Sequence, residues 1–156
     1  MEVKPMKILI IEDDINDCNN FINCIKNRND IELVGLTDSD VEGLKYVKLK
    51  RPEGIILDLE LNNSKTGNAD SLQFFSKLKN LNLNYEPIVI VTTHVKSRIT
   101  YDILHREGAA LILYKDHPGY SYDNVLNTFI NLRKIEPTKT VETIKEELED
   151  SRNKIS

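Results

Sequence analysis

The chain has 156 residues and a mass of 18.0 kDa, which fits one domain with a short appendage. Its formal net charge of −4 supplies no overall basic field, so we do not expect direct binding to nucleic acid. No apolar run approaches the ~20 residues that cross a bilayer, and the N-terminus lacks the apolar core of a signal peptide. We therefore expect a cytoplasmic protein without a membrane partner.

The first predicted strand, residues 7–11, is an apolar run that ends in three acids, Glu12, Asp13 and Asp14. Apolar residues then recur at helical spacing from Ile15 to about residue 26, which predicts an amphipathic helix. Either Asp13 or Asp14 can cap that helix. Taken alone, acids at a helix start are explained by the helix macrodipole.

The third predicted strand begins at Gly54 and carries Asp58 near its end. A strand at residues 31–36 and a helix that stops before Pro52 precede it. The run before Asp58 shows no alternation, so both of its faces should be covered, as in a parallel sheet between helices. A lone aspartate at a strand end is commonly a loop cap. Its position is also where open α/β sheets place their binding crevices.

The remaining elements repeat the order of strand and helix. Residues 62–68 are polar and without apolar periodicity, so we expect a mobile loop. The elements that follow are a helix opened by Asp70 or Ser71, a strand at 87–93, a helix through Ile99 and Leu104 that Gly108 ends, a strand at 110–114, and a helix capped by Ser121. Five strand–helix units in strict alternation predict a doubly wound α/β fold with right-handed crossovers.

We expect residues 1–135 to form this domain and residues 136–156 to form a helical tail or linker. Val141, Ile144 and Leu148 follow a three–four spacing within a strongly acidic segment. Two interpretations remain open: a solvated helix, and a linker or dimerising helix through which two copies associate. Fewer than the ~3–4 heptads that define a coiled coil are present.

Four predicted strand ends carry side chains that form a coherent chemical set: Glu12 with Asp13, then Asp58, Thr92 and Lys115. In a parallel sheet these ends lie along one edge. Clustered carboxylates suit Mg²⁺, a hard ion that takes oxygen ligands and keeps several waters. Asp58 can attack phosphorus to form an aspartyl phosphate, while Mg²⁺, a hydroxyl and an ammonium share the negative charge of the transferring group. Each residue alone has an ordinary structural explanation, but their coincidence indicates a functional site.

The same residues resemble the receiver domain of two-component response regulators over about residues 5–135. Residues 7–14, Lys-Ile-Leu-Ile-Ile-Glu-Asp-Asp, resemble the first-strand motif with its acidic pair. Residues 55–59 resemble the phosphoacceptor strand, and residues 87–92 resemble the strand that ends in the switch hydroxyl. Gly108-Ala109, with Lys115 seven residues after the glycine, resembles the lysine strand.

The resemblance implies a flavodoxin-like sheet of five parallel strands in the order 2-1-3-4-5. It implies that Glu12, Asp13 and Asp58 bind Mg²⁺, that Asp58 accepts the phosphoryl group, and that Thr92 and Lys115 contact that group. The donor in this family is a phosphohistidine on a histidine kinase or a phosphotransfer protein. We thus expect a signalling switch that catalyses only its own phosphorylation and dephosphorylation, and that controls an output partner the sequence does not identify.

Several positions depart from the family pattern. Ile112 stands where an aromatic residue is usual, although Tyr114 shares its face by the period of two. Asp116 replaces a proline that follows a cis bond, so we expect a trans peptide here, because a cis bond before a non-proline residue costs ~2.5–4 kcal/mol. Thr93 is bulkier than usual, and Asn62 replaces a loop proline. These changes put the usual aromatic-coupled output in question.

Two other functions would use a similar set of residues. A phosphohydrolase of the haloacid dehalogenase type also uses an aspartate nucleophile, but it has a second aspartate two residues later, where this chain has Glu60. A pseudo-receiver would bind partners without phosphorylation, although the complete set of site residues argues against it. Glu60 and His94 lie two residues beyond Asp58 and Thr92, where they could modulate the lifetime of the phosphoryl group. A plain loop histidine is the simpler interpretation of His94.

Overall fold

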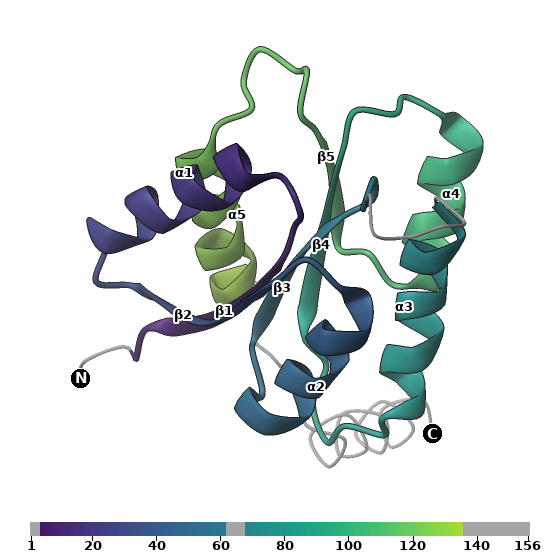
Figure 1. Ribbon diagram of the computed structural model, residues 1–156, viewed down its shortest axis with the longest axis horizontal. Helices are drawn as coiled ribbons and strands as arrows, with labels where there is room; N and C mark the ends of the chain where they lie inside the picture. Colours follow the sequence, from purple (N-terminus) through teal and green to yellow (C-terminus); the bar gives the residue numbers. More distant parts are fainter. Residues whose placement is uncertain (1–3, 62–67, 136–156) are drawn as a thin grey trace, which may run out of the picture.

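The computed structural model of the chain describes residues 4–61 and 68–135. Within these residues strands and helices alternate strictly (Figure 1). In chain order the elements are β1 (Met6–Ile11), α1 (Ile15–Lys26), β2 (Ile31–Thr37), α2 (Asp40–Lys50), β3 (Gly54–Asp58), α3 (Asn68–Asn80), β4 (Ile88–Thr93), α4 (Arg98–Glu107), β5 (Leu111–Tyr114) and α5 (Tyr122–Ile135). The alternation predicted from the sequence is confirmed.

The strands form one parallel sheet in the order β2-β1-β3-β4-β5, as predicted. Every residue of β3 is buried, which explains why its sequence shows no polar alternation. The pairing of β3 with β4 places Asp58 directly beside Thr92. The register of the sheet thus brings two of the predicted site residues to the same edge.

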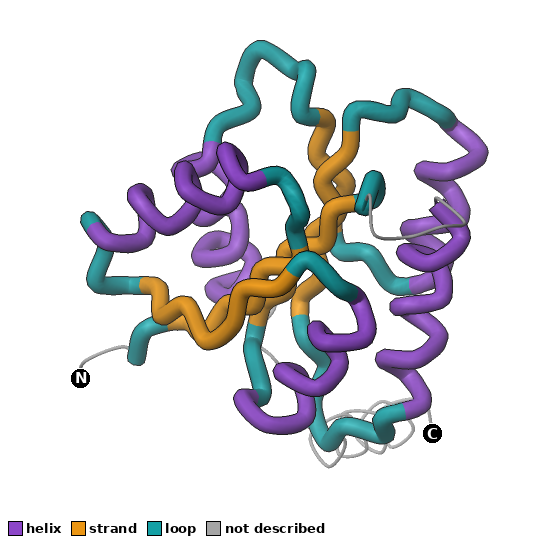
Figure 2. The backbone as a smooth tube through the Cα atoms, in the orientation of Figure 1, coloured by secondary structure: helices purple, strands orange, loops and turns teal. Residues whose placement is uncertain are grey.

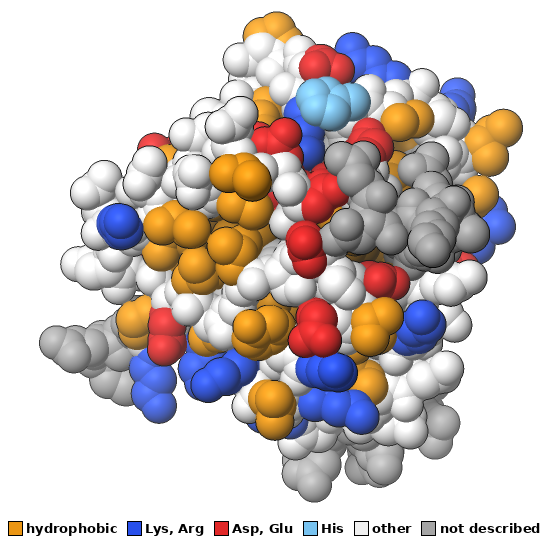
Figure 3. Space-filling model, in the orientation of Figure 1, with side chains coloured by type: hydrophobic (Ala, Val, Ile, Leu, Met, Phe, Trp, Pro, Cys, Tyr) orange, Lys and Arg blue, Asp and Glu red, His pale blue; other side chains and the backbone are white. Residues whose placement is uncertain are grey.

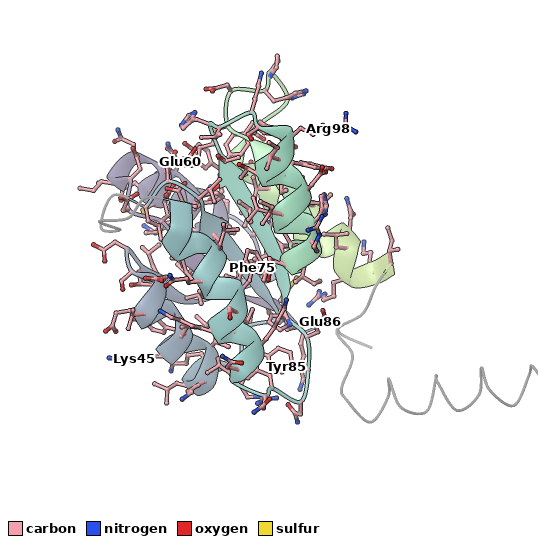
Figure 4. All side chains as sticks on the ribbon, turned by 90° about the vertical axis from the view of Figure 1, so that its right-hand side faces the viewer. Lys45, Glu60, Phe75, Tyr85, Glu86 and Arg98 are labelled. Atoms are coloured by element: carbon pink, nitrogen blue, oxygen red, sulfur yellow. The ribbon has the colours of Figure 1, made fainter. Side chains whose placement is uncertain are left out.

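Helices cover both faces of the sheet (Figures 1 and 2). One apolar cluster lies between the sheet and α2, α3 and α4, and includes Leu9, Ile11, Leu57, Phe74, Phe75 and Leu104. The other lies between the sheet and α1 and α5, and includes Ile8, Ile10, Phe21, Ile56, Val125 and Phe129. Consecutive residues of β1 alternate between the two clusters, because strand side chains point to opposite faces. Phe75 projects from α3 into the first cluster (Figure 4).

Side-chain caps mark where most of the helices begin, and a glycine marks where α4 ends. The Asp14 carboxylate accepts a hydrogen bond from the Asp17 backbone at the start of α1, and Ser39 and Ser97 cap α2 and α4 in the same way. Gly108 ends α4 with a φ of 123°, a conformation that L side chains rarely adopt. Asp14 and Gly108 confirm the predicted ends, and Asp14 resolves the alternative with Asp13.

Some details differ from the expectations. Helix α3 begins at Asn68 and not at Asp70 or Ser71, because Ala69 is a strong helix former and an acid is favoured throughout a first turn. Ile99 marks the start of α4 but is 75% exposed, so it does not belong to the core. The peptide before Asp116 is trans as predicted, since the described residues contain no cis bond. Of the expected mobile loop at residues 62–68, Asn68 instead begins α3, and the other residues lie outside the described part of the chain. The tail at residues 136–156 also lies outside it.

No helix among the described residues combines the length and the apolar character needed to cross a membrane.

Candidate functional site

The carboxyl edge of the sheet brings the predicted site residues together. Asp58 ends β3 beside Thr92 of β4, and both are buried. Glu12 directly follows β1, where its backbone N–H donates to the Thr37 carbonyl at 2.9 Å, and it is only 2% exposed. Lys115 directly follows β5, where its backbone N–H donates to the Thr93 carbonyl at 2.8 Å. Ladder hydrogen bonds therefore continue past the strand ends and hold these residues at one edge.

The Lys115 ammonium lies at the centre of the site. Its Nζ atom is 3.0 Å from Glu12 Oε1, 3.2 Å from Asp17 Oδ2 and 3.4 Å from Asp58 Oδ1. The Lys115 side chain is 8% exposed, so these contacts are poorly screened by solvent. An ammonium has three donors, and three carboxylates surround this one.

The crowding of acidic groups shifts the pKa values of the site's side chains. Burial, together with the neighbouring Asp58 and Asp17 carboxyl groups, raises the pKa of Glu12 well above its usual range. Burial alone would lower the pKa of Lys115, but the Asp58 and Glu12 carboxylates outweigh it and raise that pKa. Lys115 therefore stays charged at any physiological pH. One ammonium does not offset the charge of several crowded carboxylates, so the site has a deficit of positive charge.

Glu12, Asp13 and Asp58 could together hold a metal ion, which would supply the missing positive charge. One carboxylate oxygen from each of Glu12, Asp13 and Asp58 lies within 4.8 Å of the other two. Asp13 is partly exposed, so water can reach this side of the cluster. Oxygen donors with an open, hydrated side are the coordination that Mg²⁺ prefers, and the residues present therefore fit this ion. Figure 3 shows acidic side chains gathered near the centre of this face of the molecule.

Asp17 is a member of the site that sequence reasoning missed. It lies in the first turn of α1 and contacts Lys115 through Oδ2, while its Oδ1 accepts a hydrogen bond from the Tyr122 hydroxyl at 2.5 Å. Burial would raise the pKa of Asp17, but the neighbouring Glu12 carboxyl group, the Tyr122 hydroxyl and the Lys115 ammonium outweigh it and lower that pKa. Asp17 is the acid in the first turn of the helix that directly follows Glu12 and Asp13, a position that the helix macrodipole explains without any site.

A second polar network joins the loops beside the site. Glu60 Oε1 accepts hydrogen bonds from the Thr93 hydroxyl and the His94 backbone N–H, both at 2.7 Å. The His94 ring lies 3.0 Å from Asp116. Glu60 Oε2 is buried and has no hydrogen-bond partner within the described part of the chain. The loops after β3, β4 and β5 are thus linked, and Glu60 and His94 lie next to the site as expected (Figure 4 labels Glu60).

Comparison with known proteins agrees with this architecture. No protein-family model matches the chain. The signal receiver domain of NarL from Mycobacterium tuberculosis matches with a TM-score of 0.71 at 14% identity, over 85% of this chain and 98% of that one. The response regulator domain of CheB from Thermotoga maritima matches with a TM-score of 0.64 at 19% identity, over 85% and 99% of the two chains.

The REC domain of RcsB from Salmonella enterica serovar Typhimurium, a structure in the presence of phosphomimetic BeF3−, matches with a TM-score of 0.67 at 13% identity. That match covers 81% of this chain and 89% of the other. At these identities the likeness establishes the fold. The chain has the receiver-domain fold that the sequence predicted.

Proposed function

We propose that this chain is a Mg²⁺-dependent phosphoryl-accepting switch, with Asp58 as the phosphoacceptor. The observation that carries the proposal is the position of Asp58: buried at a strand end, 3.4 Å from Lys115 and within 4.8 Å of ligand atoms of Glu12 and Asp13. The RcsB structure adds support, because that domain of the same fold was determined in the presence of the phosphomimetic BeF3−.

The reaction follows from the chemistry of these groups. An Asp58 carboxylate oxygen forms a bond to phosphorus as the bond from phosphorus to the donor nitrogen breaks. The electron pair of that bond stays on the donor imidazole, which is the leaving group. A histidine kinase or a phosphotransfer protein would supply this phosphohistidine. Hydrolysis of the aspartyl phosphate later returns Asp58 to a carboxylate.

The other side chains of the site reduce the charge that opposes this step. When bound by Glu12, Asp13 and Asp58, Mg²⁺ supplies the positive charge that offsets the repulsion between a phosphoryl group and the carboxylates. Lys115 supplies an ammonium donor to a phosphoryl oxygen. Thr92, which pairs with Asp58 across β3 and β4, offers a hydroxyl at the same edge. A shift of Lys115 and Thr92 toward the new group would then change the surface that an output partner reads.

The hydrolase alternative is disfavoured by Glu60. In that mechanism the acid two residues after the nucleophile exchanges a proton with the substrate. Here Glu60 Oε1 instead accepts two hydrogen bonds, from Thr93 and His94, and ties loops together. We therefore retain the phosphoryl-accepting switch as the proposed function.

The test is intact mass after incubation with a small phosphodonor such as acetyl phosphate. Wild type should gain one phosphoryl group with Mg²⁺ and none with a chelator. Asp58→Asn should fold normally and gain none, because the nucleophile is lost while the shape is nearly kept. Asp13→Asn should slow the reaction relative to wild type, and more at low than at high Mg²⁺, because it weakens metal binding. Asp102→Asn, at an exposed acid of α4, should match wild type. An adduct on Asp58→Asn, or one that forms equally well in chelator, contradicts the proposal.

A further inference from the structure

Asp17 connects the predicted phosphorylation site to α5, a helix that covers the same face of the sheet as α1. It belongs to α1, and the Tyr122 that hydrogen-bonds to it belongs to α5. Lys115, which follows β5, lies on the other side of the Asp17 carboxylate at 3.2 Å. One carboxylate therefore joins three segments that are distant in sequence, and each of its oxygens has a named partner.

The contact from Lys115 to Asp17 competes with the contact from Lys115 to Asp58. The ammonium is 3.2 Å from Asp17 and 3.4 Å from Asp58, so neither partner holds it alone. The ammonium donates hydrogen bonds to Glu12 and Asp17, whereas Asp58 lies at ion-pair distance. A phosphoryl oxygen on Asp58 would compete with Glu12 and Asp17 for this ammonium, because all of them carry negative charge.

Asp17 is the contact that can be given up most readily. Glu12 and Asp58 lie at strand ends in the interior and are 2% and 4% exposed in their side chains. The Asp17 side chain is 18% exposed and keeps its hydrogen bond to Tyr122 when Lys115 leaves. Glu12 and Asp58 also accept backbone hydrogen bonds, from Asp13 and Glu60, so the difference lies in access to water. A carboxylate that water can reach loses less when its ammonium partner leaves than a buried one does.

We propose that Asp17 is a positioning residue that restrains Lys115 in the unphosphorylated protein, and that Tyr122 fixes the orientation of Asp17. This inference rests on the proposed function of Asp58. Phosphorylation then moves one Lys115 donor from Asp17 to a phosphoryl oxygen. The hydrogen bond between Asp17 and Tyr122 links that movement to α5, so α1 and α5 are the helices that sense the state of the site.

The first experiment measures the restraint in metal-free protein, without phosphorylation. Hydrogen exchange at the Lys115 ammonium is followed by ¹⁵N NMR, with the signal assigned by its loss in Lys115→Met. Asp17→Asn should speed the exchange by about threefold to tenfold, because a charge-assisted hydrogen bond is weakened. Tyr122→Phe should give a smaller increase. Tyr120→Phe is the matched control, because the Tyr120 hydroxyl has no hydrogen-bond partner among the described residues, and it should change nothing.

The second experiment is a mutant cycle on the phosphorylation rate with acetyl phosphate and saturating Mg²⁺. Asp17→Asn should speed the reaction in the wild-type background, because Lys115 is released toward the phosphoryl group. The same change should have no effect in Lys115→Met, since the restrained group is absent. Equal acceleration in both backgrounds would show simple charge repulsion and contradict the restraint, as would slower phosphorylation of Asp17→Asn or unchanged exchange in the first experiment.

The two proposals fail separately. If wild type takes up no phosphoryl group, the proposed function is wrong, and the exchange experiment still decides whether Asp17 restrains Lys115. If wild type is phosphorylated on Asp58 but the cycle is additive, only the inference on Asp17 is wrong.

Discussion

Lys115 is the side chain on which the charge balance of the site depends. Its ammonium is the cation that the structure places among Glu12, Asp17 and Asp58. Without a metal ion, it partly takes the place that a divalent cation would fill. Lys115 and Mg²⁺ should therefore oppose each other's binding to the same carboxylates, because both are attracted by the same negative charge.

We expect Lys115→Met to bind Mg²⁺ more tightly than wild type. Methionine keeps much of the length and apolar stem of lysine but removes the competing charge, which should raise the affinity by roughly tenfold. Tyrosine fluorescence during a Mg²⁺ titration measures the affinity, since the chain has six tyrosines and no tryptophan. Lys79→Met is the control, because Lys79 is 60% exposed and pairs with Glu107. Weaker Mg²⁺ binding by Lys115→Met would contradict this account.

The sequence predicted the strand-end residues of the site but not all of its members. Glu12, Asp58, Thr92 and Lys115 could be placed together because parallel strands end at one edge, whatever the details of helix packing. Asp17 could not, because its contact with Lys115 depends on how α1 packs against the sheet. At the start of a helix, an acid is also adequately explained by the macrodipole. The hydrogen bonds of Glu60 were missed for a similar reason, since they depend on loop conformations.

Strands and helices were predicted better than their boundaries. Apolar runs and helical periodicity identified all the elements within the described residues, because burial on one or both faces leaves a strong pattern. The start of α3 was wrong by two residues, since several consecutive residues there can serve as a cap or as a first turn. The exposed position of Ile99 was also not evident, because a single apolar residue at helical spacing does not reveal how far a helix is covered.

An ion pair at the start of β2 should make stability depend on pH. Arg28 donates from Nε and Nη2 to the Asp30 carboxylate at 2.8 and 2.9 Å, and these hydrogen bonds lower the pKa of Asp30. Because the pKa of Asp30 is lower in the folded than in the unfolded protein, the ion pair stabilises the fold fully at pH values above the unfolded pKa of 3.8. This stabilisation is lost as the pH falls through the folded pKa.

We therefore expect Asp30→Asn to lower the free energy of unfolding at pH 7 by about 0.5 kcal/mol, a small value because the pair is partly screened by solvent. The difference from wild type should shrink as pH falls below the usual pKa of aspartate. Urea denaturation at several pH values measures it. Asp123→Asn should have less effect, because Asp123 is 3.7 Å from Arg28 and more exposed. A constant difference at every pH would be inconsistent with the pair.

The start of β3 has no room for a side chain. A Cβ added to Gly54 would lie 2.6 Å from Ile8 Cδ1 and 2.7 Å from Phe129 Cδ1, so α5 or the strand would have to shift. We expect Gly54→Ala to lower the free energy of unfolding by about 1–3 kcal/mol, the usual effect of overpacking a core. Gly119→Ala should be nearly neutral, because Gly119 is exposed and its added Cβ would lie 3.2 Å from His117 Nδ1, in a side chain that can move. Equal stability of the two variants would show that the packing at Gly54 yields easily.

The molecule as a whole has two apolar layers on either side of one sheet, and the polar site lies where that sheet ends. The layers fix the strands, and the strands fix the positions of Glu12, Asp58, Thr92 and Lys115. The loops and helix starts that surround this edge supply Asp17, Glu60 and His94. The fold thus supplies the position and the charge on which the central claim rests. That claim is the proposal that Asp58 accepts the phosphoryl group.

The most direct test of that claim is to identify the modified residue. Protein incubated with acetyl phosphate and Mg²⁺ is treated with borohydride, which reduces an acyl phosphate to an alcohol, and peptides are then sequenced by mass spectrometry. We predict that the peptide containing Asp58 carries the reduced side chain, and that omission of Mg²⁺ prevents it. Reduction at Glu12, Asp13 or Asp17 in place of Asp58, or a modification that resists borohydride, would contradict the account.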